Sequence, residues 1–131
     1  MSNVDAFKKS YEAFQRGDLD AVTEDWSDDI KWENPNASQI PNSGTTEGKD
    51  DVKQLLADTP KYWEEFTVTP DEFFEEGDTV VVLAHIEAKA KESGNEVKLP
   101  VVHVGRFEDG KLARFQQLFD TALTAEALGR L

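Results

Sequence analysis

Hydrophobic and polar residues follow two different spacings along the chain, and the change from one to the other predicts the order of the elements. In the first half, apolar side chains recur every three or four positions, which indicates amphipathic helices. In the second half they alternate with polar side chains, which indicates strands with one buried face. We therefore predict helices over residues 4–16, 19–26 and 49–58, and strands over residues 65–75, 79–91, 96–108 and 112–120.

Turn-forming residues separate these elements. Gly17 ends the first helix, and Pro35 ends a short strand over residues 30–34. Residues 35–48 are rich in Asn, Ser, Pro, Gly and Thr, and they predict a long loop of the kind that forms a lid or a pocket rim. Helices followed by an antiparallel meander predict a single α+β domain over residues 1–131, with helices covering one face of a curved sheet.

Two histidines lie on neighbouring predicted strands, and alternation decides which way each one faces. His103 falls on the apolar face of its strand, whereas His85 falls on a mixed face that also carries charged residues. A pairing symmetric about Gly94 would set the two histidines opposite each other and bury those charges, which is costly. We therefore predict a two-residue turn at Ser93-Gly94 that sets Ala84 beside His103. His85 then faces away, and no metal site is expected.

The outer face of the same two strands keeps several apolar residues among its polar ones. Because an apolar patch on the far face of a sheet is a candidate interface, we expect a homodimer through this surface. Ordinary half-exposed strand valines are the alternative. The residues concerned are Val81, Leu83, Val102 and Val104.

Charge and composition exclude several classes of protein. The formal net charge is −13, from 27 acidic and 14 basic residues, and such a surface repels phosphate backbones, so nucleic acid is not an expected partner. No apolar run approaches the roughly 20 residues that span a bilayer, and the N-terminus lacks a signal-peptide core. We expect a cytoplasmic protein with no membrane partner. The absence of cysteine excludes a disulfide scaffold.

Five segments resemble, in chain order, the nuclear-transport-factor-2-like superfamily, in its SnoaL-like, ketosteroid-isomerase-related branch. They are YEAFQRGDLDAV, WENP, EGKDDVKQLL, EEGDTVVVLAH and VVHVGRFEDGKLARFQQLFDTA. The last segment is the most specific, and the resemblance covers nearly the whole chain. It implies a cone-shaped, cystatin-like roll, in which a strongly curved antiparallel sheet wraps around a pocket and packs against the N-terminal helices. It also implies a dimer.

The resemblance assigns family roles to particular positions of this chain. The catalytic aspartate of ketosteroid isomerases corresponds to Asn34, and an amide cannot accept a proton at neutral pH. The protonated aspartate of their oxyanion hole corresponds to His103. Its partner tyrosine falls at or beside Ser10, next to Tyr11, and a supporting tyrosine falls on Leu56. Steroid isomerisation is therefore not expected.

His103 is the main candidate for chemistry. An unperturbed histidine pKa of about 6.5 suits acid–base work near neutral pH, and a satisfied core histidine is the alternative. Asn34 is a candidate for orienting a carbonyl or a water. SnoaL-like cyclases carry an acid/base aspartate near the end of the last strand, for which Asp120 is the nearest match, although alternation turns it outward and it can instead fix the next turn. Glu33 also points outward, opposite Asn34.

Five further residues are expected to contact a ligand, with plain core packing as the alternative for the aromatic ones: Tyr11, Trp32, Phe115, Gln117 and Phe119. No cofactor or metal is expected. Three hypotheses about function remain. The first is a cofactor-free isomerase, cyclase or hydratase acting on a small apolar carbonyl or polyketide-like compound. The second is a non-catalytic ligand-binding domain, and the third is a dimeric interaction domain with a filled core.

Overall fold

A computed structural model describes residues 2–130, and in them four helices precede or separate the first strands while a fifth follows the last strand. None of the helices in this range is long and apolar enough to cross a membrane. The elements in chain order are α1 (Asn3–Gln15), α2 (Leu19–Val22), β1 (Trp26–Asn34), β2 (Gly44–Glu47), α3 (Lys49–Ala57), α4 (Thr59–Tyr62), β3 (Trp63–Glu76), β4 (Thr79–Ala90), β5 (Glu96–Glu108), β6 (Lys111–Phe119) and α5 (Thr121–Ala127).

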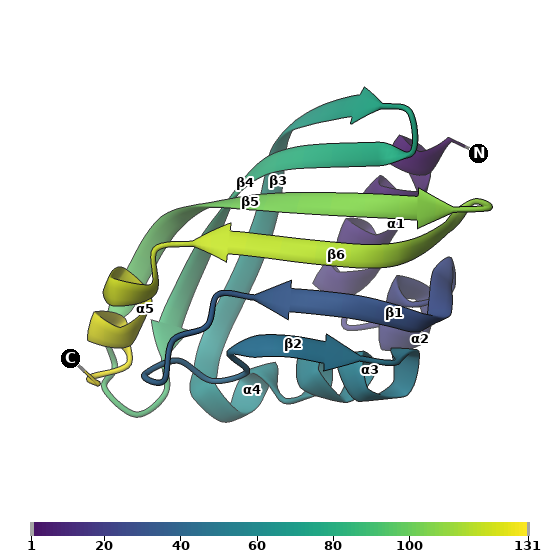
Figure 1. Cartoon of the computed structure of the whole chain (residues 1–131). Helices are drawn as coiled ribbons and strands as arrows, with labels where there is room; N and C mark the ends of the chain where they lie inside the picture. Colours follow the sequence, from purple (N-terminus) through teal and green to yellow (C-terminus); the bar gives the residue numbers. More distant parts are fainter. Residues whose placement is uncertain (1, 131) are drawn as a thin grey trace.

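The strands form one curved, open sheet in the order β2-β1-β6-β5-β4-β3. Neighbouring strands run antiparallel except β1 and β6, which are parallel, so the sheet is mixed at one pair where we expected it to be antiparallel throughout. Helices α1 to α4 cover one face of the sheet, and α5 lies at one end of it (Figure 1). The α+β prediction, with a curved sheet packed against N-terminal helices, is confirmed.

Side-chain alternation in β4 and β5 follows the prediction, but their register does not. Val82, not Ala84, lies opposite His103, and Ala84 pairs with Val101. The predicted two-residue turn is wrong, because β4 ends at Ala90 and the connection to β5 occupies residues 91–95. The shift is by two residues, which keeps every side chain on its predicted face. His103 therefore stays buried, with 4% of its surface exposed.

Several short elements differ from the prediction. The helix expected over residues 19–26 ends at Val22, and Trp26 instead begins β1. The expected loop over residues 35–48 contains β2, which pairs with β1, and α4 follows α3 after Asp58. Pro60 lies in the first turn of α4, where its missing N–H costs nothing. A short helix, α5, follows the last strand, and Asp120 caps it by accepting a hydrogen bond from the backbone N–H of Leu123 at 2.9 Å.

Close packing of α1 on the sheet depends on Gly105 in β5. A Cβ atom added there would lie 2.9 Å from Phe7 Cζ and 3.1 Å from Leu112 Cδ1. The Phe7 ring occupies that space and stacks on Tyr11 of the same helix, with ring centroids 5.5 Å apart. Gly105 thus brings α1 close enough to the sheet for Tyr11 to reach across to the neighbouring side chains of β5.

Strand β3 forms one edge of the sheet and carries an irregularity in its middle. The register against β4 shifts between Pro70 and Glu72, which leaves Asp71 as an extra residue. The Asp71 carboxylate accepts from His85, whose Nδ1 lies 2.9 Å from Asp71 Oδ2. His85 therefore lies on the outer face, away from His103, as alternation predicted.

Candidate functional site

The helices and the covered face of the sheet enclose an apolar pocket. Its volume is about 170 Å³, and all three tryptophans and both tyrosines of the chain line it. The indole of Trp32 stacks on the Phe115 ring with centroids 3.9 Å apart and planes 14° from parallel, which fixes one wall. The aromatic residues of the lining are Phe7, Tyr11, Phe14, Trp26, Trp32, Tyr62, Trp63, Phe66, Phe115 and Phe119.

Sheet register places three polar side chains in one row across this apolar wall. His103 of β5 pairs with Gln117 of β6. Asn34 of β1 lies one step beyond the Glu33–Gln116 pair, next to Gln117. All three side chains line the pocket, because neighbours across a sheet share a face.

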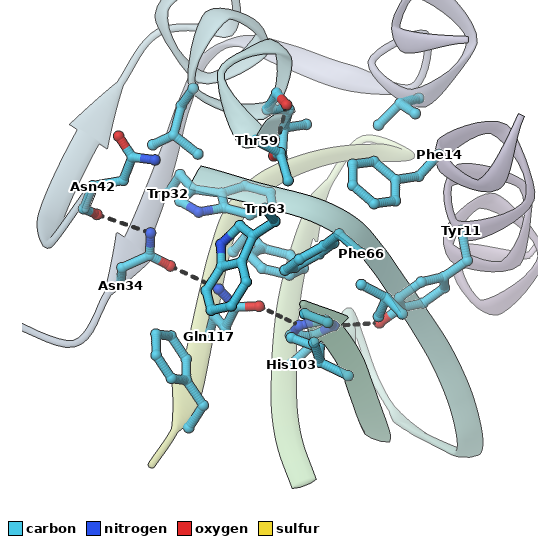
Figure 2. Close-up of a pocket in the computed structure, with 18 of the residues that line it drawn as sticks. Tyr11, Phe14, Trp32, Asn34, Asn42, Thr59, Trp63, Phe66, His103 and Gln117 are labelled. Carbon is cyan, nitrogen blue, oxygen red and sulfur yellow. Dashed lines mark hydrogen bonds between the residues drawn. The ribbon is translucent and has the colours of Figure 1, made fainter. Parts of the chain in front are cut away.

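The row forms a continuous chain of hydrogen bonds (Figure 2). Tyr11 Oη lies 2.6 Å from His103 Nδ1, and His103 Nε2 lies 2.8 Å from Gln117 Oε1. Gln117 Nε2 donates to Asn34 Oδ1 at 3.0 Å, and Asn34 Nδ2 donates to the backbone carbonyl of Asn42 at 2.9 Å. The chain thus connects helix α1, three strands and the loop between β1 and β2.

The backbone carbonyl of Asn42 fixes the direction of every bond in this chain. A carbonyl oxygen only accepts, so Asn34 must turn its NH₂ group toward it and its Oδ1 toward Gln117. Gln117 then presents its NH₂ group to Asn34 and its Oε1 to the imidazole. His103 must carry its proton on Nε2, which leaves Nδ1 to accept the proton of the Tyr11 hydroxyl.

Burial changes the titration of both ring groups. It lowers the pKa of His103 from 6.5 to about 4, an effect that the hydrogen bond to Gln117 opposes only in part. The imidazole is therefore neutral at neutral pH. Burial also raises the pKa of Tyr11, so its phenol stays protonated. Both groups enter the chain of hydrogen bonds in their neutral forms.

The lining carries no Asp, Glu, Lys or Arg residue within residues 2–130, although the chain as a whole has a net charge of −13. The charged side chains lie outside the pocket. Two donors in its wall have no hydrogen-bond partner in the described part of the chain, the indole N–H groups of Trp26 and Trp32. The pocket thus combines an apolar wall with neutral polar groups.

Seven of the predicted site residues line the pocket and two outward-facing acids do not. His103, Asn34, Tyr11, Trp32, Phe115, Gln117 and Phe119 are brought together. Glu33 faces outward and accepts from Arg114 Nη2 at 2.8 Å. Asp120 is exposed, caps α5 and lies outside the lining, so its predicted catalytic role is not supported by its position. The residue corresponding to a supporting tyrosine, Leu56, also lines the pocket.

Several functional positions were missed in the sequence. Asn42 contributes a backbone carbonyl, which no side-chain pattern reveals, although its loop was expected to form a pocket rim. Ile40 from the same loop is 5% exposed and lines the pocket. Trp63 and Phe66, at the start of β3, also line the pocket (Figure 2). An isolated apolar residue in a polar loop, as at Ile40, is the one signal that points to such a contact.

An open, curved six-stranded sheet that encloses an apolar pocket beneath helices defines the nuclear-transport-factor-2-like, cystatin-like class of domains. Residues 7–115 match the model of the SnoaL-like domain, so the chain belongs to the SnoaL-like family. The resemblance inferred from the sequence motifs is confirmed. A comparison with curated protein sequences finds no match to this chain.

Solved structures with the same architecture extend over nearly the whole chain. A protein of unknown function from Burkholderia pseudomallei, described as NTF2-like, is 36% identical with a TM-score of 0.91, and the match covers 98% of each chain. TerC co-crystallised with polyporic acid is 30% identical with a TM-score of 0.89, covering 97% of this chain and 98% of TerC. A protein with a cystatin-like fold from Xanthomonas campestris is 25% identical with a TM-score of 0.84, and the match covers 98% of this chain and 97% of that protein.

Proposed function

We propose that this domain binds a small, neutral, largely apolar compound that carries a carbonyl group. The observation that carries the proposal is a lining without ionised side chains, in which a neutral His103 is the central polar group. Burying a charged ligand there would leave the charge unpaired, at a cost of several kcal/mol. The second amide hydrogens of Asn34 and Gln117, which the chain of hydrogen bonds does not use, supply donors for a carbonyl oxygen.

The size of the pocket narrows the class of ligand. A volume of about 170 Å³ is close to that of an engineered apolar cavity of about 150 Å³ that binds benzene. One or two fused rings therefore match the enclosed space. Support for a small-molecule ligand in this fold also comes from TerC, which was co-crystallised with polyporic acid.

Catalysis is the second candidate function, as a cofactor-free isomerase, cyclase or hydratase. The Tyr11–His103 pair favours it, because it lies where the resemblance to ketosteroid isomerases implies an oxyanion-stabilising group. The pocket lining offers no carboxylate, and His103 has both ring nitrogens occupied by hydrogen bonds, so a strong general base is missing near neutral pH. Binding is therefore the primary proposal.

A matched pair of ligands tests the proposed binding function. We expect 2-acetylnaphthalene to bind with micromolar affinity. Binding should quench the tryptophan fluorescence, because all three tryptophans line the pocket. The anion 2-naphthoate should bind at least about a hundredfold more weakly, since its carboxylate meets no cation. Calorimetry confirms both affinities, and chromatography with NMR reveals any conversion of the ketone. Conversion that disappears in the His103→Gln variant would establish the catalytic candidate.

Two variants of adjacent residues locate the binding site. Ala88→Leu fills the pocket, because Ala88 lines it, and should abolish the quenching. Glu87→Leu changes the neighbouring exposed residue on the other face and should leave the affinity unchanged. Equal binding by both variants, or equal affinity for ketone and carboxylate, would show that this pocket is not the binding site.

We further propose that the uncovered face of the sheet forms a homodimer interface. Leu83, Val102 and Leu118 lie in register across β4, β5 and β6, and Val81 and Val104 form the next pair. Leu83 is 39% exposed and Leu118 is 46% exposed, on a surface that otherwise carries many acidic residues. No described helix lies over the middle of this face (Figure 1). Apolar side chains in register on an uncovered sheet face support association with a second copy.

Changing Leu118 to Glu should convert the dimer to a monomer, because two copies would bring like charges together at the interface. Analytical ultracentrifugation measures the masses. Leu123→Glu is the matched control, since Leu123 is 37% exposed but lies on α5, outside the register of this patch. A wild-type chain that sediments as a monomer at high micromolar concentration would contradict the dimer.

The remaining expectations about partners and location rest on the sequence. The net charge of −13 argues against nucleic acid as a partner. A cytoplasmic location stays a prediction, and cell fractionation followed by detection of the chain is the measurement that checks it.

A further inference from the structure

The Tyr11 hydroxyl faces the pocket as an acceptor. Its proton is directed at His103 Nδ1, 2.6 Å away, because the backbone carbonyl of Asn42 sets the direction of the whole chain of hydrogen bonds. The phenol oxygen keeps a lone pair that no described residue uses. His103 has no free nitrogen, since Nε2 donates to Gln117. Tyr11 and His103 together therefore offer a ligand one acceptor and no free donor.

The opposite end of the polar row has the opposite character. Asn34 and Gln117 each use one amide hydrogen within the row and keep a second one. A ligand that lies along the row therefore meets amide donors near β1 and β6 and an acceptor at α1. The polar row therefore binds an acceptor group of the ligand at one end and a donor group at the other.

We propose that Tyr11 receives a ligand hydroxyl, so that the ligand is a neutral hydroxylated ring compound of the phenol or enol class. This inference rests on the proposed function and names its ligand more closely. The ligand hydroxyl donates to Tyr11 Oη, and the ring lies against the wall that Trp32 and Phe115 form by stacking. A carbonyl on the same ring system reaches the amide hydrogens of Asn34 and Gln117.

This polarity is the reverse of an oxyanion hole. An oxyanion hole presents donors to a carbonyl oxygen, and a tyrosine at this position would serve it only with a free hydroxyl proton. Here the Tyr11 hydroxyl already donates its proton to Nδ1 of His103, which is in the neutral Nε2–H tautomer. A bare ketone gains nothing from Tyr11, whereas a hydroxyl group gains a bond that burial in an apolar wall makes valuable.

The tautomer of His103 tests the first half of the inference without any ligand. In a ¹⁵N-labelled sample at pH 7, long-range ¹H–¹⁵N correlations should show protonated Nε2 and unprotonated Nδ1. The Asn34→Asp variant should keep this tautomer, because a carboxylate still accepts from Gln117. Asn34→Leu removes the acceptor, lets the Gln117 amide turn over, and should give a mixture of tautomers. A wild-type Nδ1–H tautomer would overturn the inference.

A second matched pair of probes tests the ligand class. The wild-type chain should bind 2-naphthol about tenfold more tightly than 2-methoxynaphthalene, which lacks the hydroxyl proton. In the Asn34→Leu variant this preference should shrink, because Tyr11 regains a free proton. Equal or tighter binding of the methoxy compound by the wild-type chain would overturn the hydroxyl assignment while leaving the proposed function intact. Failure of both probes and of 2-acetylnaphthalene to bind would overturn the proposed function itself.

Discussion

Acidification from pH 6.5 to pH 4 is expected to remove about 3 kcal/mol from the free energy of unfolding through His103 alone. Burial lowers the folded-state pKa of His103 to about 4, whereas the unfolded chain titrates near 6.5. Between these two pKa values His103 is protonated in the unfolded state and neutral in the folded state, so the free energy of unfolding falls as pH falls. Each unit of difference between the two pKa values corresponds to roughly 1.4 kcal/mol in the free energy of unfolding. The contribution is fully present above pH 6.5.

The His103→Gln variant isolates this contribution from the many carboxylates, which titrate equally in both proteins. A glutamine amide can donate toward Gln117 and accept from Tyr11, but it does not titrate. Urea unfolding at a series of pH values should show the wild-type chain losing about 3 kcal/mol more than the variant between pH 6.5 and pH 4. Parallel losses in the two proteins would mean that His103 is protonated without penalty when the chain is folded.

Gly105→Ala is expected to destabilise the fold by about 1–3 kcal/mol through overpacking. Gly105 does not have a positive φ angle, so a glycine is needed there for lack of space and not for its backbone conformation. The added methyl group would overlap the Phe7 ring, which stacks on Tyr11. Displacement of Phe7 should therefore also disturb the bond between Tyr11 and His103. Urea unfolding measures the first effect, and the imidazole ¹⁵N signals of His103 report the second.

A compensating change provides the control for this variant. Phe7→Leu replaces the ring with a smaller side chain, and the double variant with Gly105→Ala should be more stable than the sum of the two single effects. Simple additivity, or a Gly105→Ala chain as stable as the wild type, would show that the sheet and α1 move apart at little cost.

The faces of the strands could be predicted from the sequence because alternation is a local property. The inward position of His103 and the outward positions of His85 and Glu33 follow from strand parity alone, and the structure agrees. The exact register could not be predicted. A slip of two residues keeps every side chain on its face, so no burial cost distinguishes Ala84 from Val82 as the neighbour of His103.

The chemistry of the site depends on features that no sequence pattern carries. The Asn42 carbonyl is a backbone group, and only the folded loop shows that it meets Asn34. The pKa of His103 reflects its burial, and its ring contacts Tyr11 and Phe115, which come from opposite ends of the chain. The resemblance matched Asp120 to the acid/base aspartate of SnoaL-like cyclases, but its side chain accepts a hydrogen bond in the first turn of α5. A role in this turn was the alternative that the sequence left open.

The irregular edge strand β3 limits how copies of this chain can meet. An exposed edge invites another strand to add to the sheet, which leads to open-ended aggregates. Pro70 offers no backbone N–H, the extra residue Asp71 interrupts the ladder, and acidic side chains flank both, including Glu65, Glu72 and Glu75. These features disfavour the addition of a second copy at this edge, which leaves the uncovered face of the sheet for the proposed dimer. Strand β3, the longest strand of the sheet, can therefore border solvent without offering a continuous ladder to another strand.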